Sequence, residues 1–422
     1  MFLGRRLFLL FFAVLALMLT INYMTSRSTR QPTENLKEHS ACVAPEDGCN
    51  RDDYNFLLDC YTHGVWEFKP GLTKEMIRER REVDKGILEN LGFPSELHRE
   101  DGRCGQVYRL PNGLQSICDE ESDAPCCNEE TGICGNSNEH CFCPYCKDFS
   151  KYSAAELAEW KPSSQECQLQ RFNSDDACAL LNTHVSELVF VGDSFIRHFF
   201  VALSLLITGD PVRGALRSTL SEEEKEQCSG ELQFVDRGKH LCHLRTIQGW
   251  EEFGENQVCN GKARFKSYLV EAYGQSQLPL AVNAVKDLLG KRKAIVILGI
   301  GIHFSLNSTQ VIVNYLKPLL ALIENSSINE RPLLIWANIH QVDNFLTSDS
   351  VKNYPPVEKF NKEMSTFCRE RNIPVLETSR VTRYIKSNDG QHFGYGGNMA
   401  KVQILVNYLK SVFEKRQGSD PK

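Results

Sequence analysis

Three residues in two short motifs carry the side chains of an activated nucleophile. Ser194 ends the run Val191-Gly-Asp-Ser194, and Asp389 and His392 lie three residues apart in a second run near the C-terminus. With this spacing in a loop, the carboxylate can accept a hydrogen bond from one imidazole nitrogen while the other nitrogen faces the serine hydroxyl. Together these residues could attack an acyl carbonyl through the serine, with the histidine as the base.

Both motifs also have structural interpretations. A serine between an apolar strand and a helix is commonly an N-cap, and the second motif is compatible with a turn that carries a surface histidine. A cysteine nucleophile is not favoured, because no recognisable base stands beside the cysteines of this region, which we expect to form structural bridges. They are Cys228, Cys242, Cys259 and Cys368. Taken together, the two motifs favour a serine-hydrolase-like site.

The elements that must position these motifs alternate between strand and helix. Short apolar runs rich in β-branched residues predict strands at 188–191, 294–298, 333–336 and 373–376. Helical patterns separate or follow them at 195–207, 278–289, 309–323, 356–371 and 398–413. This alternation predicts a three-layer α/β domain with a parallel sheet and right-handed crossovers. Because ligands bind at the carboxyl ends of such strands, we expect the two motifs to meet there.

The two motifs resemble those of the SGNH/GDSL hydrolase superfamily, and in particular its PC-esterase branch, which includes plant trichome birefringence-like polysaccharide acetyltransferases. The approach to the serine supports the narrower assignment. It contains Trp160-Lys-Pro162, Cys167, Gln170-Arg-Phe172 and Cys178. The resemblance covers about residues 155–415 and implies a flavodoxin-like parallel sheet. It also implies that Ser194 is the nucleophile, His392 the general base and then acid, and Asp389 the group that orients His392.

The oxyanion donors that the resemblance would assign are open. The superfamily's third motif, usually Gly-x-Asn-Asp, is replaced here by a different sequence, Leu298-Gly-Ile-Gly-Ile-His303-Phe-Ser-Leu-Asn307. The candidate donors are the amides of Ser194 and Gly214 and the side chains of His303 and Asn307. A buried core histidine with a hydrogen-bond partner is the alternative interpretation of His303.

Two further residues are candidates to face a substrate. Arg197 and His198 follow the serine by about one helical turn, and positions three and four apart share a helix face. Either side chain could instead bond a neighbouring carboxylate or backbone group. The sequence therefore leaves their part in the site open.

A dense group of cysteines precedes the α/β region. Eight of the 17 cysteines lie between Cys104 and Cys146, a density that a short segment needs when it is held together by disulfides instead of a large core. Zinc ligation by Cys141, Cys143 and Cys146 is the alternative, but an oxidising compartment favours disulfides. We expect a small disulfide-rich module at 101–148 and no metal.

The order of these cysteines resembles the hevein-like, chitin-binding type 1 module. The adjacent pair Cys126-Cys127 followed by Gly132-Ile-Cys-Gly-Asn-Ser-Asn-Glu-His-Cys141 carries the resemblance. It implies the pairs Cys104–Cys127, Cys118–Cys134 and Cys126–Cys141, with Cys143–Cys146 as a fourth. It also implies an N-acetylglucosamine-type sugar ligand at residues 104–146. Ile133 and His140 replace aromatic residues of the family's sugar site, so a purely structural module is the alternative.

The N-terminal segment predicts membrane targeting. Arg5 and Arg6 precede an apolar run, and residues 1–25 are expected to form an uncleaved, single-pass anchor with a cytoplasmic N-terminus. A cleaved signal peptide is the alternative, although no small-x-small cleavage site follows the run. A stem and helical lead-in follow at 26–100, with a charged helix over 73–90 whose Arg and Glu side chains we expect to face solvent.

This topology predicts a luminal C-terminal part in the Golgi or endoplasmic reticulum membrane. Asn307 and Asn325 stand in glycosylation sequons. The formal net charge of −6 argues against a nucleic-acid partner. We find no phosphate-cradling loop or nucleotide fingerprint, which disfavours a sulfatase or a nucleotide-dependent transferase.

The expected function is a luminal, serine-dependent O-acyl esterase or acetyltransferase that acts on a glycan or polysaccharide. The acyl group expected is acetyl. No cofactor is expected, apart from an acyl donor if the enzyme is a transferase. The alternative is a non-catalytic carbohydrate-binding or scaffold protein in which the SGNH-type domain has lost its activity.

Overall fold

The computed structural model describes residues 54–110, 114–136, 141–143, 146–151, 154–327, 330–341 and 357–418. The predicted membrane anchor at 1–25 and the predicted stem as far as residue 53 lie outside the described residues. Within the described ranges, no helix combines the length and the hydropathy that a membrane span requires.

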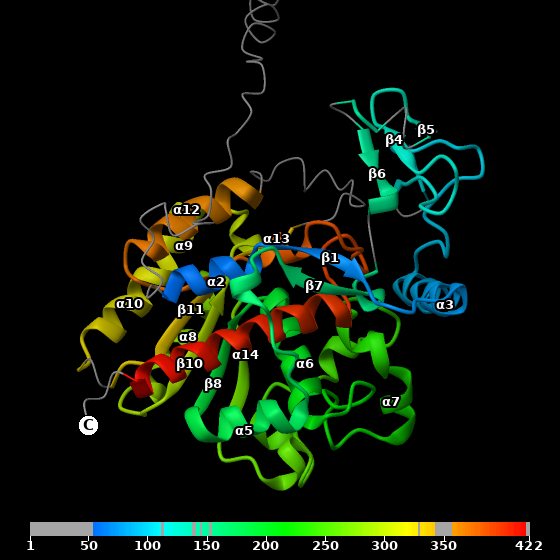
Figure 1. The fold of residues 1–422 in the computed structure, drawn as a ribbon. Coiled ribbons are helices and arrows are strands. Elements are labelled where there is room, and N and C mark those ends of the chain that lie inside the picture. Colours follow the sequence, from blue (N-terminus) through cyan, green and yellow to red (C-terminus); the bar gives the residue numbers. More distant parts are fainter. Residues whose placement is uncertain are drawn as a thin grey trace, which may run out of the picture. The chain divides into compact units, whose positions relative to one another are not determined.

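Five parallel strands form one sheet (Figure 1). In spatial order they are β9 (Lys266–Glu271), β8 (Glu187–Gly192), β10 (Ala294–Gly299), β11 (Leu333–Ala337) and β12 (Val375–Leu376). Counted along the chain this order is 2-1-3-4-5, so the direction in which strands are added reverses at β8. In open parallel sheets, ligands bind at such a switch point, outside the carboxyl ends of the strands.

The strands contribute side chains to two separate apolar cores, because successive residues of a strand point to opposite faces. In β8, Leu188 and Phe190 belong to one core, and Val189 and Val191 belong to the other. All four side chains are fully buried. Strands that are buried on both faces read as continuous apolar runs, which is why most of these segments could be predicted from the sequence.

Helices close both cores. The core that contains Phe190 is closed by α2 (Tyr54–Thr62), α5 (Ser174–His184), α6 (Ser194–Thr208) and α14 (Tyr395–Gly418). The core that contains Val189 is closed by α8 (Leu278–Leu288), α9 (Ser308–Val311), the π-helical segment Ile312–Leu316, α10 (Lys317–Glu324) and α12 (Val357–Arg369). Among the described residues, two further short α-helices are α7 (Glu222–Gln227) and α13 (Thr378–Thr382). The predicted α/β domain with a parallel sheet is thus confirmed.

The two edge strands differ most from the sequence prediction. The strand β9 was not predicted, because only alternate side chains such as Ser267 and Leu269 are buried and the run is interrupted by polar residues. At the other edge, the predicted strand at 373–376 shortens to the two-residue β12. The strand β9 has a partner on one side only, and its sequence is less uniformly apolar than that of the central strands.

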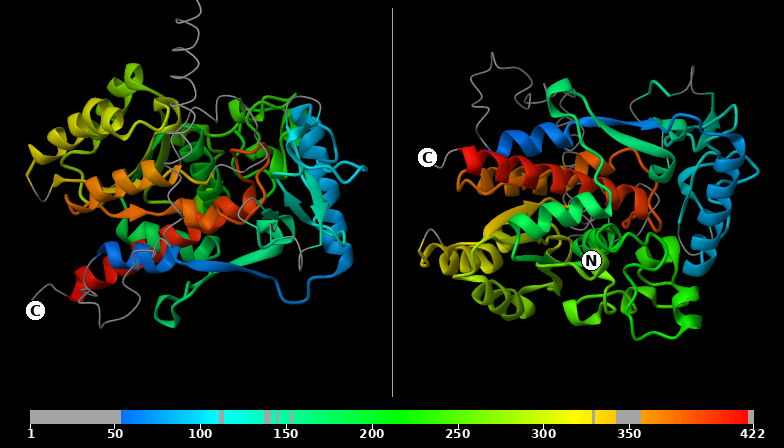
Figure 2. Two further views of the ribbon diagram at one scale, coloured as in Figure 1. Left: turned by 90° about the horizontal axis from the view of Figure 1, so that it is seen from above. Right: turned by 60° about the horizontal axis from the view of Figure 1, so that its bottom comes forward.

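The predicted lead-in at 26–100 requires a correction, because part of it belongs to the α/β core. Leu58 and Tyr61 of α2 are buried against α14, and a disulfide joins Cys60 to Cys167. Figure 2 shows α2 beside α14 in both views. The next strand, β1 (Gly64–Phe68), pairs antiparallel with β7 (Ala158–Pro162). A nine-residue helix carries too weak a pattern to reveal this packing from the sequence.

The predicted charged helix is α3 (Lys74–Leu91), which begins at an N-cap, Thr73, and ends at Gly92 with φ 75°. One of its arginines does not face solvent as expected. The Arg80 side chain is 10% exposed, and its guanidinium lies 2.7 Å from a carboxylate oxygen of Glu231 and 3.5 Å from one of Glu156. The lead-in helix is therefore joined to the α/β domain by buried charges.

The cysteine-rich module consists of short antiparallel strands. They are β2 (Gly105–Arg109), β3 (Gln115–Ser116), β4 (Cys126–Asn128), β5 (Ile133–Gly135) and β6 (Cys146–Asp148). The disulfides are Cys104–Cys127, Cys118–Cys134, Cys126–Cys141 and Cys143–Cys146, the pairs that the hevein-like resemblance implies.

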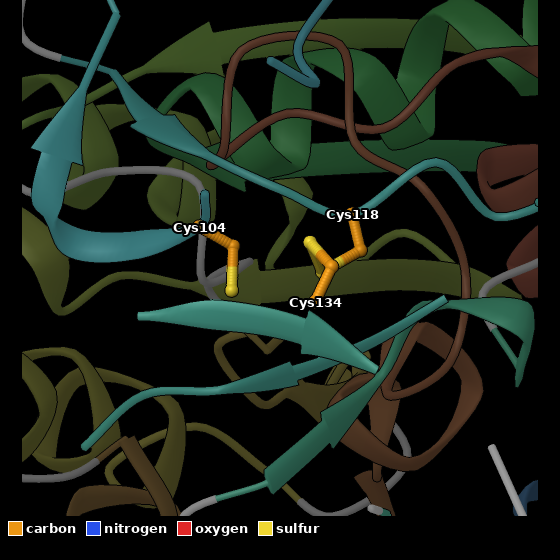
Figure 3. A group of neighbouring side chains, drawn as sticks. All are labelled: Cys104, Cys118 and Cys134. Carbon is orange, nitrogen blue, oxygen red and sulfur yellow. A yellow bond between two sulfur atoms is a disulfide. The ribbon is translucent and has the colours of Figure 1, made fainter. Parts of the chain in front are cut away.

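One group of sulfurs in the module has the spacing of a metal site. The Sγ atoms of Cys104, Cys118 and Cys134 lie within 4.8 Å of one another (Figure 3). All three belong to disulfides, two of them to the same one. Zinc binds cysteine as the thiolate, so the disulfide-bonded group does not offer those ligands.

Candidate functional site

Ser194 lies at the junction of β8 and α6, at the carboxyl edge of the sheet. The residue before it, Asp193, is the N-cap of α6: its Oδ1 accepts a hydrogen bond from the amide of Phe195 at 3.1 Å. Burial raises the pKa of Asp193 to about 6. Because Asp193 caps the helix, the Ser194 hydroxyl is not needed as the N-cap of α6.

Gly192, the last residue of β8, lies where β8 and β10 approach closely and where the chain turns into α6. A Cβ at this position would lie 2.0 Å from the carbonyl oxygen of Gly299 in the neighbouring strand β10 and 2.5 Å from the Ile196 side chain. Any larger residue would push β8 and β10 apart. The local sequence thus fixes the position of the serine at the edge of the sheet.

The second motif brings its imidazole to the serine. His392 Nε2 lies 2.8 Å from Ser194 Oγ, and His392 Nδ1 lies 2.7 Å from Asp389 Oδ2. An ionised carboxylate only accepts hydrogen bonds, so Nδ1 donates to it and Nε2 is left to accept from the serine hydroxyl. The three residues predicted from the sequence therefore form one continuous chain of hydrogen bonds.

Backbone amides hold the carboxylate in place. Asp389 Oδ1 accepts from the amides of Gln391 at 2.9 Å and His392 at 2.7 Å, so its other oxygen remains free for the ring. The pKa of Asp389 is lowered: burial opposes ionisation, but His392 and the two amides outweigh it. An ionised aspartate in this position fixes both the tautomer and the direction of the imidazole.

The electrostatic surroundings favour a protonated His392. Burial disfavours the charged ring, but the carboxylates of Asp389 and Asp236 outweigh this effect and raise the pKa of His392 above its ordinary value. Ser194 is 5% exposed and His392 is 7% exposed. The His392 ring is therefore more basic than a histidine in water and is shielded from bulk solvent.

A second carboxylate, Asp236, lies beside the imidazole. Its Oδ2 is 3.4 Å from His392 Nε2, and its Oδ1 is 3.1 Å from His198 Nε2. Its pKa is lowered, because the hydrogen bond from His198 and the nearby charges of His392 and Arg197 outweigh the effect of burial. Asp236 was not predicted from the sequence; it lies in a bend just after the 3-10 helix Gly230–Phe234, where no periodic pattern marks it.

Arg197 and His198 lie under the site and contact charged groups of the protein. Arg197 is 2% exposed and forms ion pairs with Asp236 and Glu271, and it donates to the Tyr273 hydroxyl at 2.6 Å. Burial lowers the pKa of His198 to about 4, so this ring is neutral at physiological pH. The alternative interpretation, a bond to a neighbouring carboxylate, is the arrangement observed for both residues.

The network also includes residues that the sequence analysis missed. Glu271 is the last residue of β9, and Tyr273 follows it; the Tyr273 hydroxyl donates to Glu271 Oε1 at 2.6 Å. Both therefore lie at the carboxyl edge of the sheet. The signal that could have found them was the alternating run at 266–271, which marks a strand next to the serine strand.

The geometry alters the interpretation of two of the oxyanion candidates, Gly214 and His303. The amide of Gly214 donates to the carbonyl oxygen of Asp210 at 3.0 Å within a turn, so it does not offer a free donor. His303 is exposed, which rules out the buried core interpretation. Its ring packs edge-on against Tyr273, with the centroids 4.9 Å apart.

The Asn307 side chain caps a helix. It is the N-cap of α9, and its Oδ1 accepts from the amide of Gln310 at 3.0 Å. Asn307 and His303 line an open, largely polar hollow at the carboxyl end of β10. Asn307 and Asn325 are both exposed, as glycosylation would require.

The cysteines of the α/β domain are structural, with one exception to the predicted pairing. Cys178 pairs with Cys259, and Cys228 pairs with Cys242. Cys368, for which a bridge was expected, is a free, buried thiol, and burial raises its pKa to about 12. Such a thiol remains protonated and does not compete with Ser194 as a nucleophile.

Comparisons with known proteins add one likeness. No protein-family model matches the chain, and no curated protein matches it. Among solved structures, a member of the lipolytic protein G-D-S-L family from Veillonella parvula is similar over 52% of this chain and 97% of its own, with 15% identity and a TM-score of 0.30.

Proposed function

We propose that this chain is a serine-dependent O-acyl esterase or O-acetyltransferase that acts on a glycan through an acyl-serine intermediate. The observation that carries the proposal is the continuous hydrogen-bonded chain from Asp389 through His392 to Ser194. A serine hydroxyl is a weak nucleophile, and a buried, oriented imidazole is what activates it. The three residues come from two segments far apart in the sequence and converge at the switch point of the sheet.

In the proposed reaction, the Ser194 oxygen attacks the acyl carbonyl carbon of an ester while His392 Nε2 takes the hydroxyl proton. The bond between that carbon and the departing alcohol oxygen then breaks, and His392 gives the proton to the departing oxygen, which leaves an acyl ester on Ser194. The oxygen of water or of a sugar hydroxyl next attacks the acyl carbon, the bond between that carbon and the Ser194 oxygen breaks, and the free acid or the new sugar ester is released. His392 removes the incoming proton and returns it to Ser194.

The negative charge that develops on the carbonyl oxygen needs donors. The amide of Ser194 is the candidate we retain, because it lies at the N-terminus of α6, where the first amides have no partner within the helix and the helix dipole favours negative charge. Gly214 is not retained, since its amide is occupied. The exposed His303 is retained as a side-chain donor beside the Tyr273 ring.

We infer the glycan substrate from the resemblances, and the disulfides support the proposed compartment. Seven disulfides join described cysteines, and such bonds persist in oxidising compartments, which supports a luminal location in the Golgi or endoplasmic reticulum. The hevein-like module is proposed to bind an N-acetylglucosamine-type sugar. Its residue Ile133 is 49% exposed on β5, where the family has an aromatic ring.

The proposal is tested by incubating the purified full chain with an acetylated oligosaccharide and quenching in acid. Mass spectrometry should find one acetyl group on the peptide that contains Ser194. Adding an unacetylated oligosaccharide then distinguishes the two activities: a transferase forms the acetylated acceptor, and an esterase releases acetate. A folded chain that forms neither the acyl-serine nor a product would favour the non-catalytic carbohydrate-binding alternative.

A further inference from the structure

A lysine is buried behind the candidate catalytic loop. Lys401 of α14 is 2% exposed, and its Nζ lies 2.9 Å from His340 Nδ1 and 3.0 Å from Asn398 Oδ1. Neither of these groups is a carboxylate. A buried amine normally needs an anionic partner or loses its charge, so this arrangement is unusual for a merely structural lysine.

The hydrogen bonds of His340 have a defined direction. Its Nε2 lies 2.7 Å from the carbonyl oxygen of Gln391, and a carbonyl only accepts, so Nε2 carries the hydrogen. In the neutral ring Nδ1 is then an acceptor, and Lys401 is the donor to it. The chain of donors therefore runs from Lys401 through His340 to the carbonyl of Gln391.

That carbonyl belongs to the same peptide group as the amide of His392. The amide donates to Asp389 Oδ1 at 2.7 Å. A hydrogen bond accepted by the oxygen of a peptide group polarises it and strengthens the bond that its N–H donates. His340 thus acts on the Asp389 carboxylate through a single peptide group.

The ring of His340 also packs against residues next to the candidate triad. Its centroid is 3.6 Å from the ring of Phe195, the residue after Ser194, and 5.0 Å from the ring of Phe393, the residue after His392. His340 is 1% exposed. One buried side chain therefore contacts neighbours of both the serine and the histidine.

The charges around the pair favour a neutral imidazole. Burial and the nearby Lys401, His392 and His198 lower the pKa of His340 well below its ordinary value, although the bond to Gln391 opposes this. Burial lowers the pKa of Lys401 to about 7. The neutral ring keeps one tautomer, which the directed chain of hydrogen bonds requires.

We propose that His340 and Lys401 are positioning residues for the Asp389 and His392 pair, a role that rests on the proposed function. Lys401 fixes the ring of His340, and His340 fixes the peptide group between Gln391 and His392. Without this support, Asp389 and His392 would move relative to Ser194. Displacements of about 1 Å in such a site reduce the rate by roughly 100-fold.

The test compares four variants of the full chain: His340→Leu, His340→Gln, Lys401→Met and the double variant with leucine and methionine. The readouts are kcat and KM for an aryl acetate and the rate of covalent labelling by a fluorophosphonate. We expect His340→Leu to lower kcat and the labelling rate by roughly 10- to 100-fold with KM unchanged. His340→Gln offers a donor and an acceptor and should recover most of the rate. Lys401→Met should add no further loss to His340→Leu.

A matched control separates positioning from general damage to α14. Gln403 lies two residues from Lys401, and its side chain bonds the backbone of Phe172 at 2.8 and 2.9 Å. Gln403→Met should lower the melting temperature and leave the labelling rate of each folded molecule unchanged. If His340→Leu does not fold, the test compares the labelling rate of folded Lys401→Met with that of folded Gln403→Met.

Two negative results have different meanings. If the native chain is not labelled and does not cleave the ester, the proposed function fails. If the native chain is labelled and His340→Leu and Lys401→Met react at its rate, or lose rate only in proportion to their unfolded fraction, the positioning role is wrong while the proposed function stands. Equal losses for His340→Gln and His340→Leu would also contradict the role.

Discussion

The Asp236 carboxylate lies 3.4 Å from His392 Nε2, the ring nitrogen that also faces the serine hydroxyl. When Ser194 loses its proton to this nitrogen, the imidazolium that forms is attracted to Asp236 on one side and to Asp389 on the other. The charge of Arg197, which is paired with Asp236, limits how far this second carboxylate opposes a developing oxyanion. Two carboxylates therefore stabilise the charged imidazole: Asp389 at Nδ1 and Asp236 near Nε2.

Asp236→Asn is expected to lower the pKa of His392, because it removes one of the negative charges that raise it. The pH at which activity is half-maximal should fall, since the neutral base would persist to lower pH. The variant should also lose roughly 1–3 kcal/mol of stability, because His198 and Arg197 lose a charged partner while Glu271 still pairs with Arg197.

The matched control for this variant is Asp59→Asn. Asp59 also pairs with arginines, 2.9 Å from Arg369 and 3.4 Å from Arg380, but it belongs to α2. It should lower the melting temperature without moving the pH profile. An unchanged profile midpoint in Asp236→Asn would contradict the part we assign to that carboxylate.

Activity should rise with pH and then reach a plateau. The proposed base works as the neutral imidazole, and the pKa of His392 is raised above its ordinary value, so the rising limb should lie above about pH 6.5. Asp389→Asn removes the group that fixes the tautomer and should lower kcat by about 10⁴-fold, as in a Ser-His-Asp protease site. The measurement is kcat against pH. A pH-independent rate in the native chain would count against His392 as the base.

Glu231 should make stability depend on pH. Burial and the nearby Glu156 raise the pKa of Glu231 to about 7, although Arg80 opposes this. The folded chain then binds more protons than the unfolded chain between about pH 4.5 and pH 7, so the contribution of this group to stability falls as the pH rises through that range. Glu231→Gln should therefore gain stability relative to the native chain across this window. Parallel stability curves for the two proteins would refute the expectation.

The helix α2 should be required for the stability of the α/β domain. Replacing Cys60 by serine removes its disulfide to Cys167 and should cost about 2–5 kcal/mol of the free energy of unfolding. A chain that starts at residue 101 should be less stable still, because Leu58 and Tyr61 leave the core. Denaturant unfolding checks both. A chain that starts at residue 101 and is as stable as the full chain would mean that α2 is peripheral to the core.

The sequence allowed the central strands and the three residues of the proposed triad to be predicted, for a clear physical reason. β8 and β10 are buried on both faces, so each is a continuous apolar run, and Ser194 directly follows one of them. Asp389 and His392 are close in sequence, so their contact is local. The contact between His392 and Ser194 is long-range and was inferred from the expected topology of the sheet.

Other parts of the site could not be predicted, because their contacts depend on packing. Asp236 reaches the imidazole from an irregular segment, and the partners of Lys401 include His340, a residue 61 positions away in the sequence. Arg80 belongs to a charged run that looks solvated in the sequence, yet its side chain is 10% exposed and pairs with Glu156 and Glu231, whose carboxylates also accept from the first amides of α14. No periodicity distinguishes these residues from their neighbours.

The most direct test of the central claim is covalent labelling of the native full chain by a fluorophosphonate, compared with Ser194→Ala and His392→Ala. The proposed mechanism predicts that the native chain is labelled at Ser194 and that labelling is lost in Ser194→Ala and reduced to the level of an unactivated serine in His392→Ala. A native chain that is folded by its melting transition and remains unlabelled, or one whose labelling persists in Ser194→Ala, would contradict the proposed activated serine.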